Sequence, residues 1–137
     1  MDRVNCYFPI STSEVKELYI AQQFEEQFEL LLTIEDQKGR RQCPLERDVY
    51  SIGSHRDCDI RLCSQFVSKH HAILVRNPPG DVSYYRISDG DLDGNPSANG
   101  LLINGRKRQS YDLQDKDEIL FGPQVRLIYY VVKKLAD

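Results

Sequence analysis

Three segments of the 137-residue chain gather side chains that bind anions. They are SIGSHRDCDIRL at 51–62, FVSKHHAIL at 66–74 and SANGLLING at 97–105. A dianionic phosphoryl group needs hydroxyl, amide and cationic donors for its acceptor oxygens. Ser68 and Lys69 supply a hydroxyl and a cation side by side. Ser68 and Lys69 therefore have the chemistry that a phosphate site requires.

Catalysis would need more than these segments offer. Ser68 with His71 is the one candidate for a nucleophile and its base. An enzyme also needs an oriented third group, or paired carboxylates in a cleft. The sequence therefore predicts a binding protein rather than an enzyme. A hydrolase that uses Ser68 and His71 is the alternative, which a turnover assay would decide.

Two sets of side chains could be taken for metal ligands: Cys58, Cys63, His70 and His71, and separately Asp89, Asp91 and Asp93. The first set lacks the usual spacing between the histidines of a zinc site, and neighbouring residues on a strand point to opposite faces. The second set lacks the later bidentate glutamate of a calcium loop. We therefore expect neither a metal nor a cofactor.

From Phe28 onward, short runs of β-branched and aromatic residues are separated by turn residues. The runs are FELLLTI, VYSIG, DIRL, HAILV, VSYYRIS, GLLIN, DEILF and VRLIYYVV. Breaks such as QKGR at 37–40 and NPPGD at 77–81 supply the backbone angles that tight turns require. Many short strands at regular spacing predict an all-β sandwich. Its longest and most Gly/Asp-rich loop is expected at 88–98.

A different pattern precedes the strands. Hydroxyl residues at 11–13 stand before Glu14, and apolar residues follow at helical spacing. This pattern predicts a short capped α-helix over about residues 13–25. The expected organisation is an N-terminal extension at 1–27, a sandwich domain at 28–133 and a C-terminal tail at 134–137.

Composition places the chain among ordinary globular proteins, with 40% hydrophobic and 28% charged residues. The formal net charge of −3 argues against a broadly basic face for nucleic acid, so an anion site has to be local. The longest apolar-rich run, at 125–132, is far shorter than the ~20 residues of a membrane span. Because the N-terminus has no secretory pattern, we expect a cytoplasmic protein whose four cysteines are reduced.

Taken together, the motifs are similar to those of the forkhead-associated (FHA) domain family, bacterial type. That family has Gly-Arg, then Asp-Ile, then Ser-x-x-His, and then two Asn-Gly pairs separated by a short strand. The matching positions are Gly53, Asp59-Ile60, Ser68 with His71, Asn99-Gly100 and Asn104-Gly105. The resemblance covers about residues 28–132. It implies an FHA/SMAD-like β-sandwich of about ten or eleven strands, here with a short N-terminal α-helix.

The resemblance also implies a role for each matched residue. Ser68 would donate its hydroxyl to a phosphate oxygen, and Lys69 would approach the phosphate or the peptide backbone. Asn99 would hydrogen-bond the ligand's main chain and hold it extended. The residues that brace the loops without binding phosphate would be Gly53, His71 and Gly100.

Two positions depart from the family pattern. Ser54 stands where the family usually has a phosphate-binding arginine, and Ala98 stands where it often has threonine. Losing one charge-assisted hydrogen bond would cost about 1.5 to 3 kcal/mol, or roughly 10- to 150-fold in affinity. His55 and Arg56 lie in the same loop as Ser54. Our hypothesis is that Arg56 supplies the missing charge.

The densest basic cluster, at residues 106–108, lies at the far end of the strand expected over 100–104. At ~3.3 Å per residue, an extended strand places this cluster roughly 17 Å from Asn99. We therefore expect a solvated turn or a second contact surface there, outside the phosphate site.

The function implied is a phosphothreonine-dependent protein–protein interaction module that recruits a phosphorylated partner in a Ser/Thr kinase signalling pathway. The expected partner is a phosphothreonine-containing segment of a protein, such as a Ser/Thr kinase or its substrate, and neither nucleic acid nor membrane is expected. The alternative is a degenerate FHA scaffold or oligomerisation domain that binds independently of phosphate, as Ser54 and Ala98 suggest. A homo-oligomer formed through the N-terminal helix is one form of that alternative.

Overall fold

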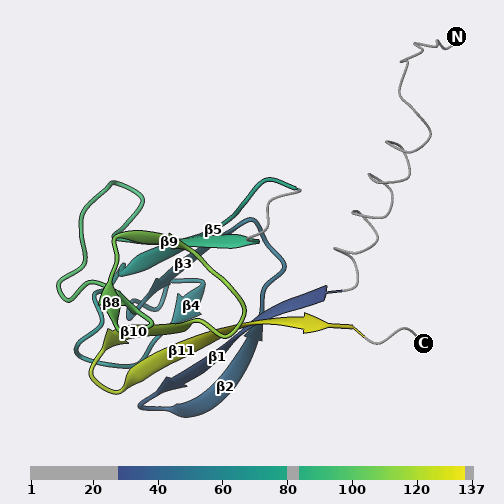
Figure 1. Ribbon diagram of the computed structural model, residues 1–137. Helices are drawn as coiled ribbons and strands as arrows, with labels where there is room; N and C mark the ends of the chain where they lie inside the picture. Colours follow the sequence, from purple (N-terminus) through teal and green to yellow (C-terminus); the bar gives the residue numbers. More distant parts are fainter. Residues whose placement is uncertain (1–27, 80–83, 135–137) are drawn as a thin grey trace, which may run out of the picture. The chain divides into compact units, whose positions relative to one another are not determined.

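The computed structural model describes residues 28–79 and 84–134, and within these ranges it has eleven β-strands (Figure 1). They are β1 (Phe28–Asp36), β2 (Gly39–Pro44), β3 (Val49–Gly53), β4 (Ile60–Arg61), β5 (Ala72–Arg76), β6 (Tyr85–Asp89), β7 (Leu102–Ile103), β8 (Arg106–Lys107), β9 (Ser110–Asp112), β10 (Glu118–Gly122) and β11 (Val125–Lys133). Residues 29–132 form one compact unit.

The strands form two sheets. The six-stranded sheet has the order β2-β1-β11-β10-β7-β8, and the five-stranded sheet has the order β4-β3-β5-β6-β9. β3 and β4 pair in parallel, with Ile52 opposite Ile60, whereas β5 pairs antiparallel with both β3 and β6. β2 and β4 are therefore edge strands, one in each sheet.

Alternation along the strands sends every second side chain into the space between the sheets. In β11, Val125, Leu127 and Tyr129 are fully buried, and in β10 the same holds for Ile119 and Phe121. Burying a side chain of this size contributes about 1.5 to 3 kcal/mol relative to leaving it exposed. The packed layers make a rigid frame from which the connecting loops project.

The all-β sandwich predicted from the strand pattern is confirmed, but the fold-class prediction was wrong in adding a helix. The described residues form strands, turns and loops and contain no helix, and so none that is long and apolar enough to cross a bilayer. The segment 13–25 lies outside the described residues. The capping pattern predicted a helix there, and a homo-oligomer through that helix was a separate hypothesis. Capping and spacing alone do not establish a helix of this length, because isolated helices of about 12 to 15 residues are marginal in water.

Two core tyrosines differ in what their hydroxyl groups contact. Tyr85 and Tyr129 are both fully buried, and their rings meet edge to face with centroids 6.5 Å apart. The Tyr85 hydroxyl donates to the carbonyl oxygen of Arg47 over 2.7 Å. The Tyr129 hydroxyl has no hydrogen-bond partner among the described residues. Burial raises the pKa of both phenols, so both hydroxyls remain neutral.

This difference predicts opposite effects of removing the two hydroxyls. Tyr129→Phe should leave the free energy of unfolding unchanged or raise it by up to about 1 kcal/mol, because an unpaired buried polar group is destabilising. Tyr85→Phe should lower it by about 0.5 to 1.5 kcal/mol, because a hydrogen bond is lost. Urea unfolding of the two variants measures both effects. Equal losses in both would show that the Tyr129 hydroxyl is paired.

Candidate functional site

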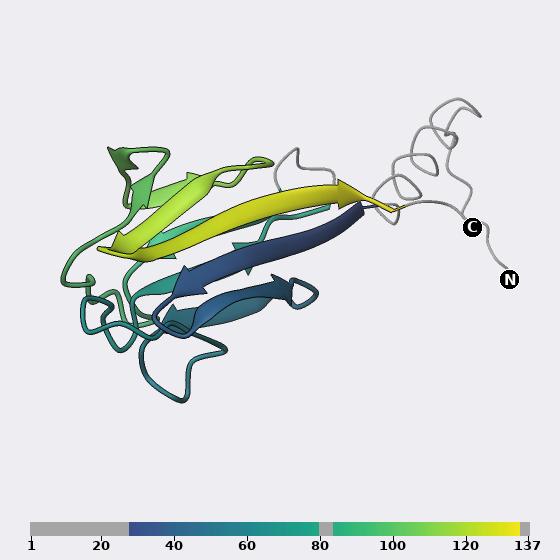
Figure 2. The same ribbon diagram turned by 90° about the horizontal axis from the view of Figure 1, so that it is seen from below.

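Three loops gather at the end of the sandwich where β11 begins (Figure 2). They are residues 54–59 between β3 and β4, 62–71 between β4 and β5, and 90–101 between β6 and β7. The Ser54 N–H donates to the Ser68 carbonyl oxygen over 3.0 Å and joins the first two loops. The sandwich thus brings segments that are distant in sequence side by side.

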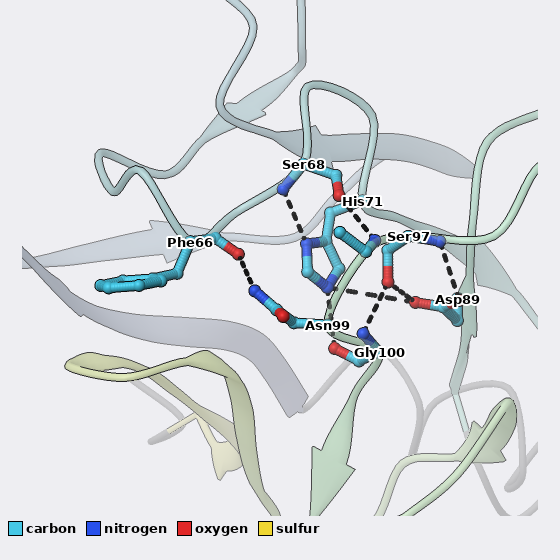
Figure 3. Close-up of polar contacts among 8 residues, drawn as sticks. Phe66, Ser68, His71, Asp89, Ser97, Asn99 and Gly100 are labelled. Carbon is cyan, nitrogen blue, oxygen red and sulfur yellow. Dashed lines mark hydrogen bonds and ion pairs between the residues drawn. The ribbon is translucent and has the colours of Figure 1, made fainter.

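His71 bridges the second and third loops (Figure 3). Its imidazole is fully buried and packs edge-on against Phe121, with ring centroids 4.9 Å apart. Nδ1 accepts the Ser68 N–H over 3.1 Å, and Nε2 lies 2.8 Å from the Gly100 carbonyl oxygen. Because Nδ1 is an acceptor, Nε2 carries the proton and donates it to Gly100. The bridge therefore requires a neutral imidazole.

The loop at 90–101 is also fixed by Asp89 (Figure 3). The Asp89 carboxylate accepts the Ser97 hydroxyl proton and also the Ser97 N–H, the latter over 3.1 Å. The Ser97 hydroxyl oxygen in turn accepts the Gly100 N–H over 2.8 Å. Gly100 has a φ of +74°, which side-chain-bearing residues rarely adopt.

Ser97 is a residue that the sequence reasoning did not single out. Its position shortly before an Asn-Gly pair was the available signal, because serine hydroxyls commonly bond the backbone of a following turn. Asp89, considered above as part of a calcium loop, instead has its carboxylate engaged by Ser97.

Ser68 and Asn99 each keep one polar group uncommitted. The Ser68 hydroxyl oxygen accepts the Ala98 N–H over 2.9 Å, and its own proton has no acceptor among the described residues. Asn99 is exposed, and its Nδ2 donates to the Phe66 carbonyl oxygen over 2.7 Å. The Asn99 Oδ1 accepts no hydrogen bond from the described part of the chain. A hydroxyl donor and an amide acceptor, both held in place by the protein, are thus available to a ligand.

Gly53 ends β3 against the backbone of Lys69. A Cβ atom at Gly53 would overlap the Lys69 carbonyl oxygen and lie 2.7 Å from its carbonyl carbon. Only glycine lets the two segments come this close, which in turn allows the Ser54 N–H to reach Ser68. Gly53 therefore acts through the path of the backbone.

The charged groups near Ser54 have few internal partners. The Ser54 side chain is half-buried, and its hydroxyl forms no hydrogen bond with another described residue. Arg56 and Lys69 are exposed, and neither forms an ion pair within residues 28–79 and 84–134. All three predicted positions therefore lie on loops of the same cluster, and their side-chain polar groups have no partner among the described residues.

Arg61 is a cation at this end that the sequence reasoning missed. Its Nε donates to the Ser54 carbonyl oxygen over 3.1 Å. The parallel pairing of β3 with β4 places Arg61 opposite Gly53. The sequence predicted a strand here but gave no signal of which strand it would pair with.

Lys107 is also closer than the extended chain predicted. The Asn-Gly turn at 104–105 has positive φ angles of 52° and 83°, and it folds the chain back so that Leu102 pairs with Lys107. The Lys107 Cε would lie 2.9 Å from a Cβ placed on Gly100. The expectation that the 106–108 cluster is remote was therefore wrong for Lys107, because Asn-Gly is a hairpin turn.

Cys58 and His70, once considered as zinc ligands, contact each other with the thiol sulfur 3.7 Å from Nδ1. The thiol donates to the Lys69 carbonyl oxygen over 3.1 Å, and burial raises its pKa, so it stays protonated. The Cys63 N–H instead donates to Asp36. Within the described ranges, no group of three or more His, Cys, Asp or Glu side chains could hold a metal ion.

Fold and site together define a class of protein: a β-sandwich whose candidate binding groups lie on loops at one end. The FHA domain family model matches residues 50–122, just over half of the chain. The chain therefore belongs to the forkhead-associated family, whose members are interaction modules.

Two solved structures are similar over most of their length. The Slr1951 protein from Synechocystis sp. is 47% identical, with a TM-score of 0.72 over 78% of this chain and 99% of that one. A structure described under phosphothreonine-dependent FHA domain interactions is 27% identical, with a TM-score of 0.60 over 74% of this chain and 95% of that one. An uncharacterized Synechocystis sp. protein is 32% identical over 103 residues, which are 74% of this chain and 15% of that protein. The chain thus spans a small part of that relative.

The buried imidazole makes stability depend on pH. Burial lowers the pKa of His71, and the Gly100 carbonyl and Asp89 oppose this only in part. An unfolded histidine has a pKa of about 6.5, so below that pH the unfolded chain binds more protons than the folded one. His71 therefore stabilises the fold above a pH of about 6.5, and this contribution falls as the pH drops through that value, by at most about 1.4 kcal/mol per pH unit.

His71→Gln should abolish most of this dependence while His70→Gln, at an exposed neighbour, should retain it. Urea unfolding at intervals between about pH 7.5 and 5.5 measures it, because carboxylates titrate mainly below that window. Parallel stability profiles for wild type and His71→Gln would contradict the neutral bridge.

Proposed function

We propose that the chain is a phosphothreonine-dependent interaction module that recruits a phosphorylated partner protein. The observation that carries the proposal is the pair of uncommitted groups, the Ser68 hydroxyl proton and the Asn99 Oδ1, on loops that His71 holds together. Ser68 donates to a phosphate oxygen, and Asn99 accepts a backbone N–H of the ligand. Membership of the FHA family supports this assignment, as does the relative described in terms of phosphothreonine-dependent interactions.

The charge on the phosphate is met by side chains on two loops. A phosphothreonine carries about −1.5 to −2 charges near neutral pH. Arg56 and Lys69 are exposed cations without an internal ion-pair partner in the described part of the chain. Arg56 follows Ser54 by two residues, and Lys69 directly follows Ser68. We assign them to the phosphate, with the Ser54 hydroxyl as a further donor.

In this role the module performs no chemistry on its partner. A Ser/Thr kinase phosphorylates the partner, and the module binds the partner only when the phosphate is present. Because a hydroxyl and two flexible side chains replace one bidentate arginine, the affinity is lower and more sensitive to salt than an arginine would give.

A phosphate-independent scaffold is the second candidate. Ser54 and Ala98 remove two donors that the family pattern supplies. On the outer face of the five-stranded sheet, Val49 and Val75 are paired neighbours that are 45% and 41% exposed. An exposed apolar pair on a sheet suits a contact that does not need phosphate.

A peptide titration separates the two candidates. We expect a degenerate peptide library with a central phosphothreonine to bind, and the same library with phosphoserine or unmodified threonine to bind more weakly. Ser68→Ala should weaken phosphothreonine binding roughly 10- to 150-fold, because one charge-assisted hydrogen bond is lost. Equal binding of all three libraries, unchanged by Ser68→Ala, would favour the scaffold.

The same titration tests how charge is supplied beside Ser54. Ser54→Arg should tighten phosphothreonine binding, and Arg56→Ala should weaken it. Arg86→Ala is a matched control, because Arg86 is an exposed arginine on β6, paired with Asp112 and outside the three loops. If Arg56→Ala binds as tightly as Arg86→Ala, then Arg56 is not the substitute cation.

A further inference from the structure

A groove of about 650 Å³ runs between the edge strands β2 and β4. Its lining includes four basic side chains: Lys38, Arg40, Arg41 and Arg61. Among the residues that the structure describes, no acidic side chain lines it. In a chain with a net charge of −3, this is a local concentration of positive charge.

Two of the four cations are neutralised within the protein. Arg41 Nη1 lies 3.0 Å from Asp36 Oδ1, and the Asp36 side chain is completely buried behind it. Arg40 lies 3.5 Å from Glu35. Lys38 and Arg61 are exposed, and neither forms an ion pair with a residue in the described ranges. About two positive charges in the groove are thus uncompensated.

The groove is held in shape by contacts across its two walls. Arg41 Nη2 donates to the Arg61 carbonyl oxygen over 2.5 Å and so ties β2 to β4. Asp36 accepts the Cys63 N–H over 2.8 Å, which fixes the chain just after β4. The Arg41 side chain therefore spans the two walls, and the cations around it are carried on ordered backbone.

Arg61 connects this groove to the proposed phosphothreonine site. Its Nε donates to the Ser54 carbonyl oxygen over 3.1 Å, and the Ser54 N–H donates to Ser68 over 3.0 Å. Two hydrogen bonds therefore separate the groove from the serine assigned to the first phosphate. An extended ligand advances ~3.3 Å per residue, so a flank of a few residues is enough to pass from one to the other.

We propose that the groove binds a second phosphorylated side chain on the same partner segment, on one flank of the phosphothreonine. This inference rests on the proposed function. A second phosphoryl group matches the two uncompensated cations in charge, and its oxygens suit the donors of Arg61 and Lys38. The module then favours partners that carry two phosphates over those that carry one.

Singly and doubly phosphorylated peptides test the assignment. The host is an alanine-rich phosphothreonine peptide, with phosphoserine, glutamate or serine placed at successive positions on either side. At one or two adjacent positions, phosphoserine should raise affinity roughly 5- to 30-fold over serine, and glutamate should raise it less. The gain should shrink as salt is added.

The Lys38→Gln/Arg61→Gln double variant should lose this gain. Lys38→Gln alone should lose part of it and bind the singly phosphorylated host within about twofold of wild type, because Lys38 lies outside the three loops of the phosphothreonine site. Arg86→Ala, outside the groove, should keep the gain. A gain that survives in the double variant, or that appears at no position, would overturn the proposal. Glutamate equal to phosphoserine would overturn the assignment to a second phosphate.

If phosphothreonine-dependent binding itself were absent, the result would differ, because the wild-type chain would then bind the singly phosphorylated host no better than its unphosphorylated form. If the double variant unfolds at a temperature close to that of wild type, its smaller affinity gain from the second phosphate is not caused by unfolding. Lys38 and Arg61 are both exposed, so their substitution is expected to leave the core unchanged.

Discussion

The neutral imidazole of His71 is the contact on which the binding end of this domain depends. Its backbone N–H donates to Ile52 in β3 over 2.8 Å, and its ring packs on Phe121 of the opposite sheet. From that fixed position the two ring nitrogens hold Ser68 and Gly100. The hydrogen bonds from Ala98 to Ser68 and from Asn99 to Phe66 also join the loops, but Ser68 and Asn99 are the residues proposed to bind the ligand. His71 thus ties the loops to the core, and its buried side chain lies beneath them.

The sequence was most informative where chemistry and backbone geometry coincide. Ser68 and Asn99 were singled out by residue type together with the resemblance to the FHA motif, and short β-branched and aromatic runs between turn residues made the sandwich predictable. Lys107 was misplaced because a straight strand was assumed across an Asn-Gly turn. Arg61 was missed because pairing between β3 and β4 is a non-local property that periodicity does not encode. The helix predicted at 13–25 is not part of the described fold, in which every regular element is a strand.

Positive charge at this end is distributed rather than concentrated in one arginine after Gly53. Arg56 and Lys69 belong to the two loops around the proposed phosphate position. Arg61 lines the groove at β2 and β4 and also donates to the Ser54 carbonyl oxygen. Several exposed cations bind a phosphate less tightly than one bidentate fork, and they respond more strongly to salt. In the proposed complex, the same distribution of cations would contact anionic groups along the partner segment. A loss at Ser54 could thus be offset by contacts farther along the ligand.

The most direct test of this account is an NMR titration of the ¹⁵N-labelled chain with a phosphothreonine peptide and, in parallel, its unphosphorylated form. The account predicts phosphate-dependent changes in backbone amide shifts at Ser54, Ser68, Ala98 and Asn99, at the end of the sandwich where His71 bridges the loops. The amides of the central strands should move little. Identical changes with both peptides, or changes confined to the sheet faces, would contradict a phosphothreonine site built on these loops.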